Sequence, residues 1–247
     1  MIHERHISVQ RSARYYVLGE PSPKVEDVWI VCHGYGQLAK DFISEFETIA
    51  SPRRLIVAPE ALMRYYISTA PAVHGPESRV GATWMTREDR ETDIADYVGY
   101  LDSLHDEIMA GLGPKNVSLT ALGFSQGGAT ASRWVARGRT RPDRLIVWGS
   151  LLSADIAPDQ AASLFREVDL AIVYGTRDQF AEQAMIADFK RLLEGHAVPH
   201  TLTTFDGGHR MDRDTLQTLA AEHHHSTTRT EQASPLLTDE RFRMPDK

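Results

Sequence analysis

Short apolar runs alternate with segments of helical periodicity along most of the chain. The runs are rich in Val, Ile and Leu and end at turn residues, as buried strands do. They predict strands at residues 15–18, 28–32, 55–58, 117–122, 145–148, 170–174 and 201–205. A further run at residues 7–9 predicts an early strand that forms a hairpin with residues 15–18.

Three segments between these runs have the apolar spacing of amphipathic helices. The clearest is at residues 94–112, where apolar side chains recur every three or four residues: Ile94, Tyr97, Leu101, Leu104, Ile108 and Leu112. Residues 39–50 and 180–194 are predicted helices on weaker patterns. Strands that alternate with helices indicate an α/β fold, with a mostly parallel central sheet and helices on both faces.

Residues 60–90 fit neither period. The segment carries Tyr65, Trp84 and other aromatic or sulfur-bearing residues among Pro, Gly and charges. A long loop inside a compact domain is usually functional or disordered, and the aromatic content argues against disorder. We predict a lid or a wall of an acyl pocket, with Trp84 and Tyr65 as substrate contacts. The alternative is a surface excursion whose aromatic side chains pack on their own domain.

A sharp turn is predicted at residues 123–127, which read Gly-Phe-Ser-Gln-Gly. It follows the apolar run at 117–122, and small residues that can open a helix follow it. A serine between two glycines, at the corner between a strand and a helix, is typical of the nucleophile elbow of serine hydrolases. The turn holds the serine in a strained backbone conformation, so its neighbours must be small. Ser125 is the predicted nucleophile.

A serine nucleophile needs a base and an acid, and both follow Ser125 in the expected order. Asp178 comes just after the run at 170–174, and His209 lies on a glycine-bearing loop after the run at 201–205. A neutral imidazole accepts the serine proton, and a carboxylate fixes its tautomer. Asp206 is a rival acid, although its glycine neighbours favour a turn former. Asp178 could instead cap the helix that follows it.

An oxyanion hole requires two backbone amides near the nucleophile. In this type of fold one comes from the residue after the serine and the other from an early loop. Here those residues are Gln126 and Tyr35, because Tyr35 lies in a His-Gly-Tyr-Gly turn after the run at 28–32. His33, which opens this turn, is predicted to hold the loop by hydrogen bonds.

Four motifs together resemble one family. His-Gly-Tyr-Gly, Gly-Phe-Ser-Gln-Gly-Gly, Gly-Thr-Arg-Asp and Gly-Gly-His occur in the order and spacing of the small carboxylesterase/phospholipase family of α/β-hydrolases. That family includes acyl-protein thioesterases and many bacterial predicted esterases. The resemblance covers most of residues 25–220. It implies an α/β-hydrolase fold, a Ser125–Asp178–His209 triad, an oxyanion hole at Tyr35 and Gln126, and no cofactor.

The chain departs from the family pattern at a few positions. Tyr35 stands where Leu is more common, and Gln37 and Leu38 follow the second glycine of that loop, where the family often has Asp. Gln179 and Phe180 follow Asp178, where a small or apolar residue is frequent. These departures leave the mechanism in place and put the substrate in doubt.

Composition and charge narrow the function further. The chain has 247 residues with 42% hydrophobic and 25% charged content, which fits one α/β domain with a sizeable core. A net charge of −7 without a basic stripe makes nucleic acid or an anionic membrane a poor partner. The start lacks an apolar signal core, so a cytoplasmic location is expected. Cys32, the single cysteine, is expected to be a small core residue.

The end of the chain differs from the rest. Residues 223–247 are rich in Thr, Ser, Glu and Arg and have little periodicity, so they are predicted to form a mobile tail after a domain at 1–222. The run His223-His224-His225 suggests a metal site only superficially, because adjacent histidines on a helix point in different directions. No metal site is predicted.

The leading hypothesis is a serine hydrolase that cleaves esters or thioesters of small to medium acyl groups through an acyl-enzyme. A peptidase or amidase on the same triad is an open alternative, because the machinery is shared. A non-catalytic binding protein with this fold is a third hypothesis. The intact Ser, Asp and His set argues against it, since binding needs no such set.

Overall fold

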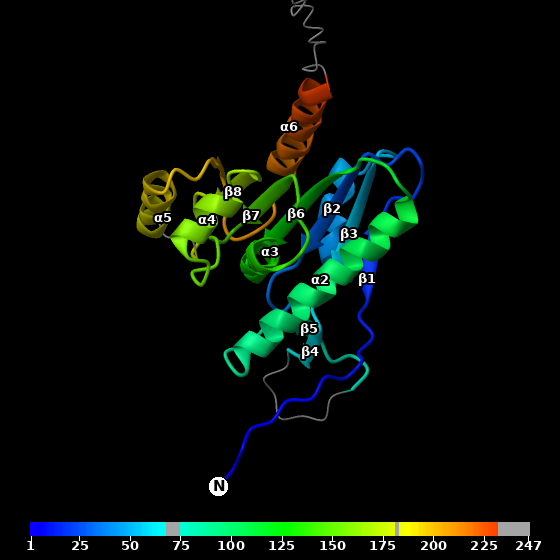
Figure 1. Ribbon diagram of the computed structural model, residues 1–247, viewed down its shortest axis with the longest axis vertical. Coiled ribbons are helices and arrows are strands. Elements are labelled where there is room, and N and C mark those ends of the chain that lie inside the picture. Colours follow the sequence, from blue (N-terminus) through cyan, green and yellow to red (C-terminus); the bar gives the residue numbers. More distant parts are fainter. Residues whose placement is uncertain (68–74, 181–182, 232–247) are drawn as a thin grey trace, which may run out of the picture.

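The computed structural model describes residues 1–67, 75–180 and 183–231. Within them a seven-stranded sheet has the order β1-β3-β2-β6-β7-β8-β9 (Figure 1). The edge strand β1 runs antiparallel to β3, and the other neighbours are parallel. The strands are β1 (Tyr15–Leu18), β2 (Asp27–Cys32), β3 (Arg54–Pro59), β6 (Ser118–Phe124), β7 (Arg144–Trp148), β8 (Asp169–Gly175) and β9 (Thr201–Phe205).

Helices cover both faces of this sheet, as the alternating pattern predicts. They are α1 (Ala39–Phe42), which continues as the 3₁₀ helix η1 (Ile43–Ile49), α2 (Arg90–Leu112), α3 (Gln126–Arg137), α4 (Pro158–Leu164), α5 (Gln183–Gly195) and α6 (Arg213–Glu231). One core lies under α2, α3, α4 and α5, and the other lies under α1, η1 and α6. The predicted α/β-hydrolase fold is confirmed.

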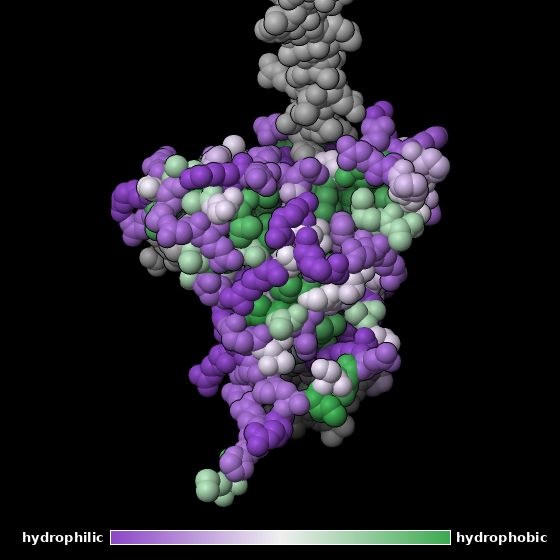
Figure 2. Space-filling view, in the orientation of Figure 1, coloured by the Kyte–Doolittle hydropathy of each residue, from purple (hydrophilic) through white to green (hydrophobic). Residues whose placement is uncertain are grey.

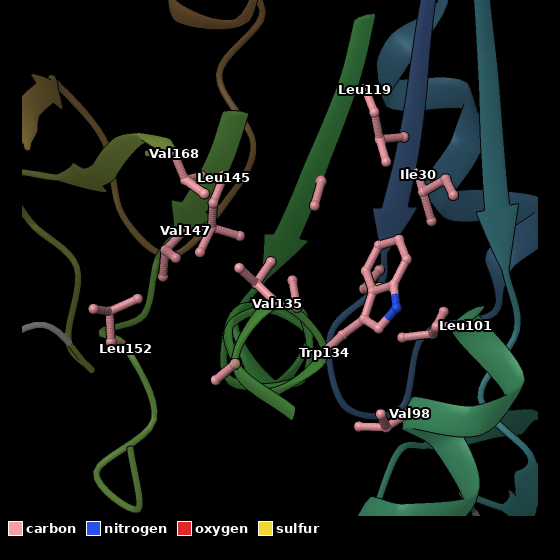
Figure 3. Close-up of a cluster of buried hydrophobic side chains, with 14 of the residues drawn as sticks. Ile30, Val98, Leu101, Leu119, Trp134, Val135, Leu145, Val147, Leu152 and Val168 are labelled. Atoms are coloured by element: carbon pink, nitrogen blue, oxygen red, sulfur yellow. The ribbon is translucent and has the colours of Figure 1, made fainter. Parts of the chain in front are cut away.

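Strand β2 shows why the central strands read as unbroken apolar runs. Val28 and Ile30 pack into the first core, while Trp29 and Val31 pack into the second. A strand covered by helices on both faces needs apolar residues at every position. In Figure 3 the Trp134 side chain of α3 reaches the space between the sheet and Leu101 of α2.

Parallel pairing brings the carboxyl ends of six strands, β3, β2, β6, β7, β8 and β9, to one edge of the sheet. Cys32 of β2 lies beside Gly123 of β6, and Phe124 lies beside Trp148 of β7. Gly175 of β8 lies beside Phe205 of β9. The loops that begin after these strands therefore leave from the same side of the molecule. In open α/β sheets ligands bind at this edge.

The predicted strand at residues 7–9 is wrong. These residues form no regular element, and Ile7 and Val9 are exposed. The strand at 15–18 is present as β1, but it pairs with β3 instead of forming an early hairpin. Residues 7–9 have the composition of a strand, but the described chain offers them no partner strand, and a lone strand leaves its backbone groups unpaired.

Residues 60–90 contain a small antiparallel pair, β4 (Met63–Tyr66) and β5 (Val80–Thr83). It lies below the main sheet in the view of Figure 1. We call it the β4–β5 ribbon. Residues 68–74, which join the two strands, lie outside the described residues.

Helix α6 continues to Glu231, so the predicted domain boundary at residue 222 falls inside a helix. The side chains of residues 223–231 and all of residues 232–247 lie outside the described part, as does the side-chain arrangement of the histidine run. The prediction of a mobile tail stays a prediction.

The described surface is mainly polar. On the face shown in Figure 2, hydrophilic residues cover most of the area and hydrophobic residues form scattered patches. None of the helices in the described residues has the length and apolar character required to cross a membrane.

Candidate active site

Ser125 stands at the corner between β6 and α3. Its backbone φ of 54° and ψ of −120° are unusual for a residue with a side chain. A Cβ atom at Gly123 would lie 2.0 Å from the Gly127 carbonyl oxygen, and one at Gly127 would lie 2.1 Å from that of Cys32. Both contacts are impossible, so the two glycines are required by close backbone approach. The turn presents the serine hydroxyl above the sheet edge.

The structure brings Ser125, Asp178 and His209 together. His209 Nε2 lies 2.9 Å from Ser125 Oγ, and His209 Nδ1 lies 2.8 Å from Asp178 Oδ2. The carboxylate can only accept, so Nδ1 carries the proton and Nε2 is free to accept the serine proton. The Asp178 side chain is buried. This is the arrangement that activates a serine for nucleophilic attack.

Asp206, the rival acid, points elsewhere. Its carboxylate pairs with the Arg177 guanidinium, and both side chains are exposed. Asp178 also accepts a hydrogen bond from the Phe180 amide at 2.9 Å through its second oxygen. Asp178 therefore has both the cap-like contact and the contact with His209, whereas Asp206 has neither.

Two phenylalanine rings flank the His209 imidazole. Phe124 packs against it with a centroid distance of 4.9 Å, and Phe180 meets it edge-on at 4.8 Å. Phe180 is 64% exposed, so it stands at the entrance to the site. The two rings restrict the orientation of the imidazole, and neither was singled out by the sequence as a site residue.

Two backbone amides beside Ser125 have no hydrogen-bond partner among the described residues: those of Tyr35 and Gln126. The neighbouring amides of the early loop are all engaged. Gly34 donates to Gln37 Oε1 at 2.7 Å, Gly36 donates to Ala82, and Gln37 donates back to Gly34. The Gln126 amide is free because it opens α3. Both amides are available to an incoming oxyanion.

The side chain of Gln126 ties the start of α3 to the end of β5. Its Nε2 donates to Thr83 Oγ1 of β5 and to the Met85 carbonyl, both at 3.0 Å, and its Oε1 accepts from the Trp84 amide at 3.1 Å. Strand β5 also holds the early loop, since Ala82 exchanges backbone hydrogen bonds with Gly36 and Gln37. One short strand therefore contacts both segments that carry the free amides.

His33 has the scaffold position predicted for it. The buried ring donates from Nδ1 to the Gly34 carbonyl at 2.8 Å and accepts from the Ala61 amide at Nε2. Burial lowers the pKa of His33, outweighing the hydrogen bond to Gly34 and the charge of Glu60, which raise it. A neutral ring is the form that can both donate and accept.

Trp84 is in the core and not on the substrate side. It is 2% exposed, packs against Tyr97 and His33, and donates its indole N–H to the His33 carbonyl at 2.9 Å. The expected substrate contact is therefore corrected: Trp84 supports the early loop from below. The alternative interpretation, in which aromatic residues of this segment pack on their own domain, describes Trp84 well.

Tyr65 lies near the site but is not part of the hollow beside Ser125. Its ring packs on that of Tyr35 with a centroid distance of 5.4 Å, and its hydroxyl lies close to Gly36. Burial and an interaction with the Tyr35 hydroxyl raise the pKa of Tyr65. Tyr35 itself is 62% exposed. The pair extends the surface around the early loop.

An open hollow of about 410 Å³ surrounds the serine. We call it the active-site hollow. Its lining consists of the catalytic candidates Ser125 and His209, the start of α3, Phe180 and the loop after β7: Gln126, Ala129, Gly149, Ser150, Leu151, Leu152, Ser153 and Ala154. Sequence reasoning missed this loop. Its position after the carboxyl end of β7 was the available signal, because the same rule placed Asp178.

One cluster among the described residues has the donor types and spacing for a metal ion: Glu4, His6 and Asp89. All three are exposed, and His6 also pairs with both carboxylates. None of the three lines the active-site hollow. Exposed groups of this kind are common without a metal, so the cluster adds nothing to the chemistry of the site.

Residues 14–227 match the model of the phospholipase/carboxylesterase family. The chain belongs to this family. Membership supports hydrolase activity and accounts for the fold and for the motifs around the site. The comparison with curated protein sequences found no match.

Solved structures with the same fold include several hydrolases. An acyl-protein thioesterase 2 from Zea mays is 15% identical, with a TM-score of 0.64 over 87% of this chain and 99% of that one. A carboxylesterase from Mesorhizobium loti is 16% identical, with a TM-score of 0.62 over 85% and 94%. A phospholipase/carboxylesterase from Dyadobacter fermentans is 17% identical, with a TM-score of 0.61 over 87% and 97%. At these identities the likeness concerns the fold.

Proposed function

We propose that the protein is a serine hydrolase that cleaves carboxylic esters or thioesters of small to medium acyl groups through an acyl-enzyme. The observation that carries the proposal is the unbroken chain of hydrogen bonds from Ser125 through His209 to Asp178. A binding protein would need no such chain. Family membership and the thioesterase and esterases of similar fold support the choice of substrate class.

The first half of the reaction acylates Ser125. Its Oγ attacks the substrate carbonyl carbon while the proton moves to His209 Nε2. Asp178 stabilises the imidazolium that forms, since its carboxylate faces Nδ1. When the tetrahedral intermediate collapses, the bond to the alcohol or thiol breaks, and the leaving group takes the proton from Nε2.

The second half hydrolyses the acyl-enzyme. Water attacks the carbonyl carbon and gives its proton to His209, and the bond to Ser125 then breaks. The serine oxygen recovers its proton from Nε2, and the carboxylic acid leaves. No cofactor takes part in this scheme, since serine, imidazole and carboxylate supply the nucleophile, the base and the acid.

The amides of Tyr35 and Gln126 form the proposed oxyanion hole. Both lack a protein partner among the described residues and flank the serine corner. In each half-reaction the carbonyl oxygen becomes an anion, and donors placed in advance stabilise it without reorganisation. The loss of one such donor costs about 2.7–4 kcal/mol in a related type of hydrolase.

Labelling with a fluorophosphonate tests the proposal. Intact-mass spectrometry should show one adduct on the wild-type protein and none on Ser125→Ala. Ser150→Ala is a matched control, because Ser150 lines the same hollow and its hydroxyl donates to the Leu151 carbonyl. It should label like the wild type. Labelling that persists in Ser125→Ala would overturn the assignment. A panel of esters, thioesters and amides with matched acyl groups then tests the substrate class.

A further inference from the structure

A second cavity lies beside the active-site hollow. Its volume is about 240 Å³, and we call it the side cavity. It is enclosed by the loop after β7, by α4 and by α5 with the residues that follow it. The residues that line it are Leu151, Leu152, Ser153, Ala154, Ile156, Ala161, Phe189, Leu192, Leu193, His196 and Val198. Most of them are apolar.

The side cavity shares one wall with the active-site hollow. Leu151, Leu152, Ser153 and Ala154 line both spaces, so this one segment borders the hollow around Ser125 and the cavity. Figure 3 shows Leu152 beside Val147 of β7, on the same side of the sheet as α3. The shared segment therefore places the cavity next to the space in which a group bound to Ser125 would lie.

The loop between the two spaces is held in place by polar contacts. Asp155 pairs with Arg133 at 3.0 Å and with Arg137 at 2.7 Å, and the Ser153 amide donates to Ser132 Oγ. Burial raises the pKa of Asp155, but hydrogen bonds from Ser153 and Arg90 and the charge of Arg133 lower it more, so the carboxylate stays ionised. Because these contacts tie the loop to α3, the cavity is formed before any ligand binds.

The chemistry of the lining suits a hydrocarbon chain. His196 is the one lining residue with a titratable side chain, and its ring lies 3.4 Å from the exposed Asp159 carboxylate. The remaining lining offers no charge to hold a polar group. The volume is just below the ~300–1,000 Å³ typical of pockets for drug-sized ligands. It fits a chain of medium length.

We propose that the side cavity binds the acyl chain of the substrate and sets its preferred length. The inference rests on the proposed function, because it needs an acyl group attached to Ser125. The acyl chain is favoured over the alcohol because it remains bound through both half-reactions, whereas the leaving group must depart after the first. This assignment moves substrate selection from the β4–β5 ribbon to the loop after β7, α4 and α5.

Two buried alanines on α4 form a matched pair for the test. Ala161 is 6% exposed and lines the cavity, while Ala162 is 7% exposed and does not. The rates kcat/KM are measured for nitrophenyl esters from acetyl to decanoyl. Ala161→Leu should lower the ratio of octanoyl to acetyl activity by about ten-fold or more, since one methylene already discriminates by about that factor. Ala162→Leu should leave this ratio unchanged.

A second variant keeps the test decisive if Ala161→Leu does not fold. Leu192 lines the cavity but is 44% exposed, so Leu192→Glu should fold and place a charge beside the chain. It should lower the same ratio while acetyl ester hydrolysis continues. An unchanged ratio in a folded variant overturns the inference.

A second series of esters distinguishes binding of the acyl chain from binding of the alcohol. In this series the acyl group is acetyl and the alcohol lengthens from ethyl to octyl. A variant that affects only this series would assign the side cavity to the alcohol and overturn the acyl assignment. Failure of the proposed function gives a different result: no ester of any length is hydrolysed, and Ser125 is not labelled.

Discussion

The β4–β5 ribbon and the loop after β7 both reach the neighbourhood of Ser125, but they do so differently. The ribbon carries aromatic residues, and its strand β5 contacts the early loop through Ala82 and Gln126 through Thr83. The loop at 149–154 has small and aliphatic residues, and it forms the wall of the active-site hollow. The ribbon, which is rich in aromatic residues, thus supports the site, while the loop at 149–154, with small and aliphatic residues, faces the active-site hollow.

The difference follows from where each segment leaves the sheet. The loop after β7 begins at the carboxyl edge, between the strands that deliver Ser125 and Asp178. The ribbon begins after β3, farther along the sheet, and Trp84, which directly follows it, is turned into the core. Closeness to β6 and β8 along the carboxyl edge therefore indicates substrate contact better than aromatic content does. We expect the ribbon to affect kcat and stability, and the loop to affect chain-length preference.

The largest expected effect tests whether Asp178 is the acid partner of His209 in the site that the two regions flank. Asp178→Asn should lower kcat by about 10⁴-fold with folding intact, because the imidazole loses the partner that fixes its tautomer. Asp206→Asn is the control and should have nearly wild-type kcat, since the Asp206 carboxylate pairs with the exposed Arg177 and, among the described residues, not with His209. Steady-state kinetics on an acetyl ester measures both. If Asp206→Asn were the more damaging change, the acid would be misassigned.

Trp84 tests the supporting role of the ribbon. Trp84→Ala should lower the free energy of unfolding by about 3–5 kcal/mol, because it empties a large buried volume. Trp84→Phe keeps a ring but removes the donor to the His33 carbonyl, and it should cost less, about 1–2 kcal/mol. Urea denaturation measures both. A stable Trp84→Ala whose chain-length optimum shifts toward bulkier acyl groups would restore this residue to the substrate wall.

Gln126 tests whether β5 positions the oxyanion hole. Gln126→Ala removes the contacts with Trp84 and Met85, and it should lower kcat by about ten-fold while KM changes little, because only the charged intermediate uses the amide. Binding of a trifluoromethyl ketone, which mimics that intermediate, should weaken in parallel.

The control for this prediction is another residue on α3. Ala129→Gly changes the same helix and the same hollow without touching β5. A rise in KM with unchanged kcat in Gln126→Ala would assign Gln126 to substrate binding and contradict a positioning role.

The smallest expected effect concerns pH. The pKa of His33 is lower in the folded protein than its ordinary 6.5, so the unfolded chain binds the proton more readily. The stability from neutral His33 is complete above pH 6.5 and is lost as pH falls toward the folded pKa, by at most about 1.4 kcal/mol per pH unit. In His33→Gln the free energy of unfolding should fall less steeply between pH 6.5 and pH 5 than it does in the wild type. If the free energy of unfolding of His33→Gln fell as steeply over this range, the pH dependence would belong to another titratable group.

Much of the fold and the core of the site could be read from the sequence because both depend on local signals. Two-sided burial makes β2, β6, β7 and β8 continuous apolar runs, and the glycines around Ser125 mark the elbow. Asp178 and His209 each follow a predicted strand, so predicting the strands also predicted the sheet edge at which these two residues lie. The prediction of a strand at residues 7–9 was wrong because a strand needs a partner strand, and the local sequence does not show whether one is present.

The substrate side was harder to predict for a physical reason. Leu151 and Leu152 look like ordinary apolar residues, and only the sheet order places them beside Ser125. Trp84 looks like a ligand contact until its exposure is known. The role of the Gln126 side chain depends on β5, whose register with the early loop is a tertiary contact. The motifs predict the reacting atoms of the proposed mechanism, while the residues that line the proposed substrate space have no distinctive chemistry.

The order of the strands has a consequence for synthesis of the chain. Strand β2 pairs with β6, far along the sequence, and His209 follows β9, the last strand of the sheet. Such long-range pairing makes folding slow, because distant segments must meet, at a cost in chain entropy, before their favourable contacts offset that cost. A ribosome-bound chain that has exposed Ser125 still lacks Asp178 and His209, the proposed acid and base. The proposed triad can therefore assemble only when nearly the whole domain has emerged.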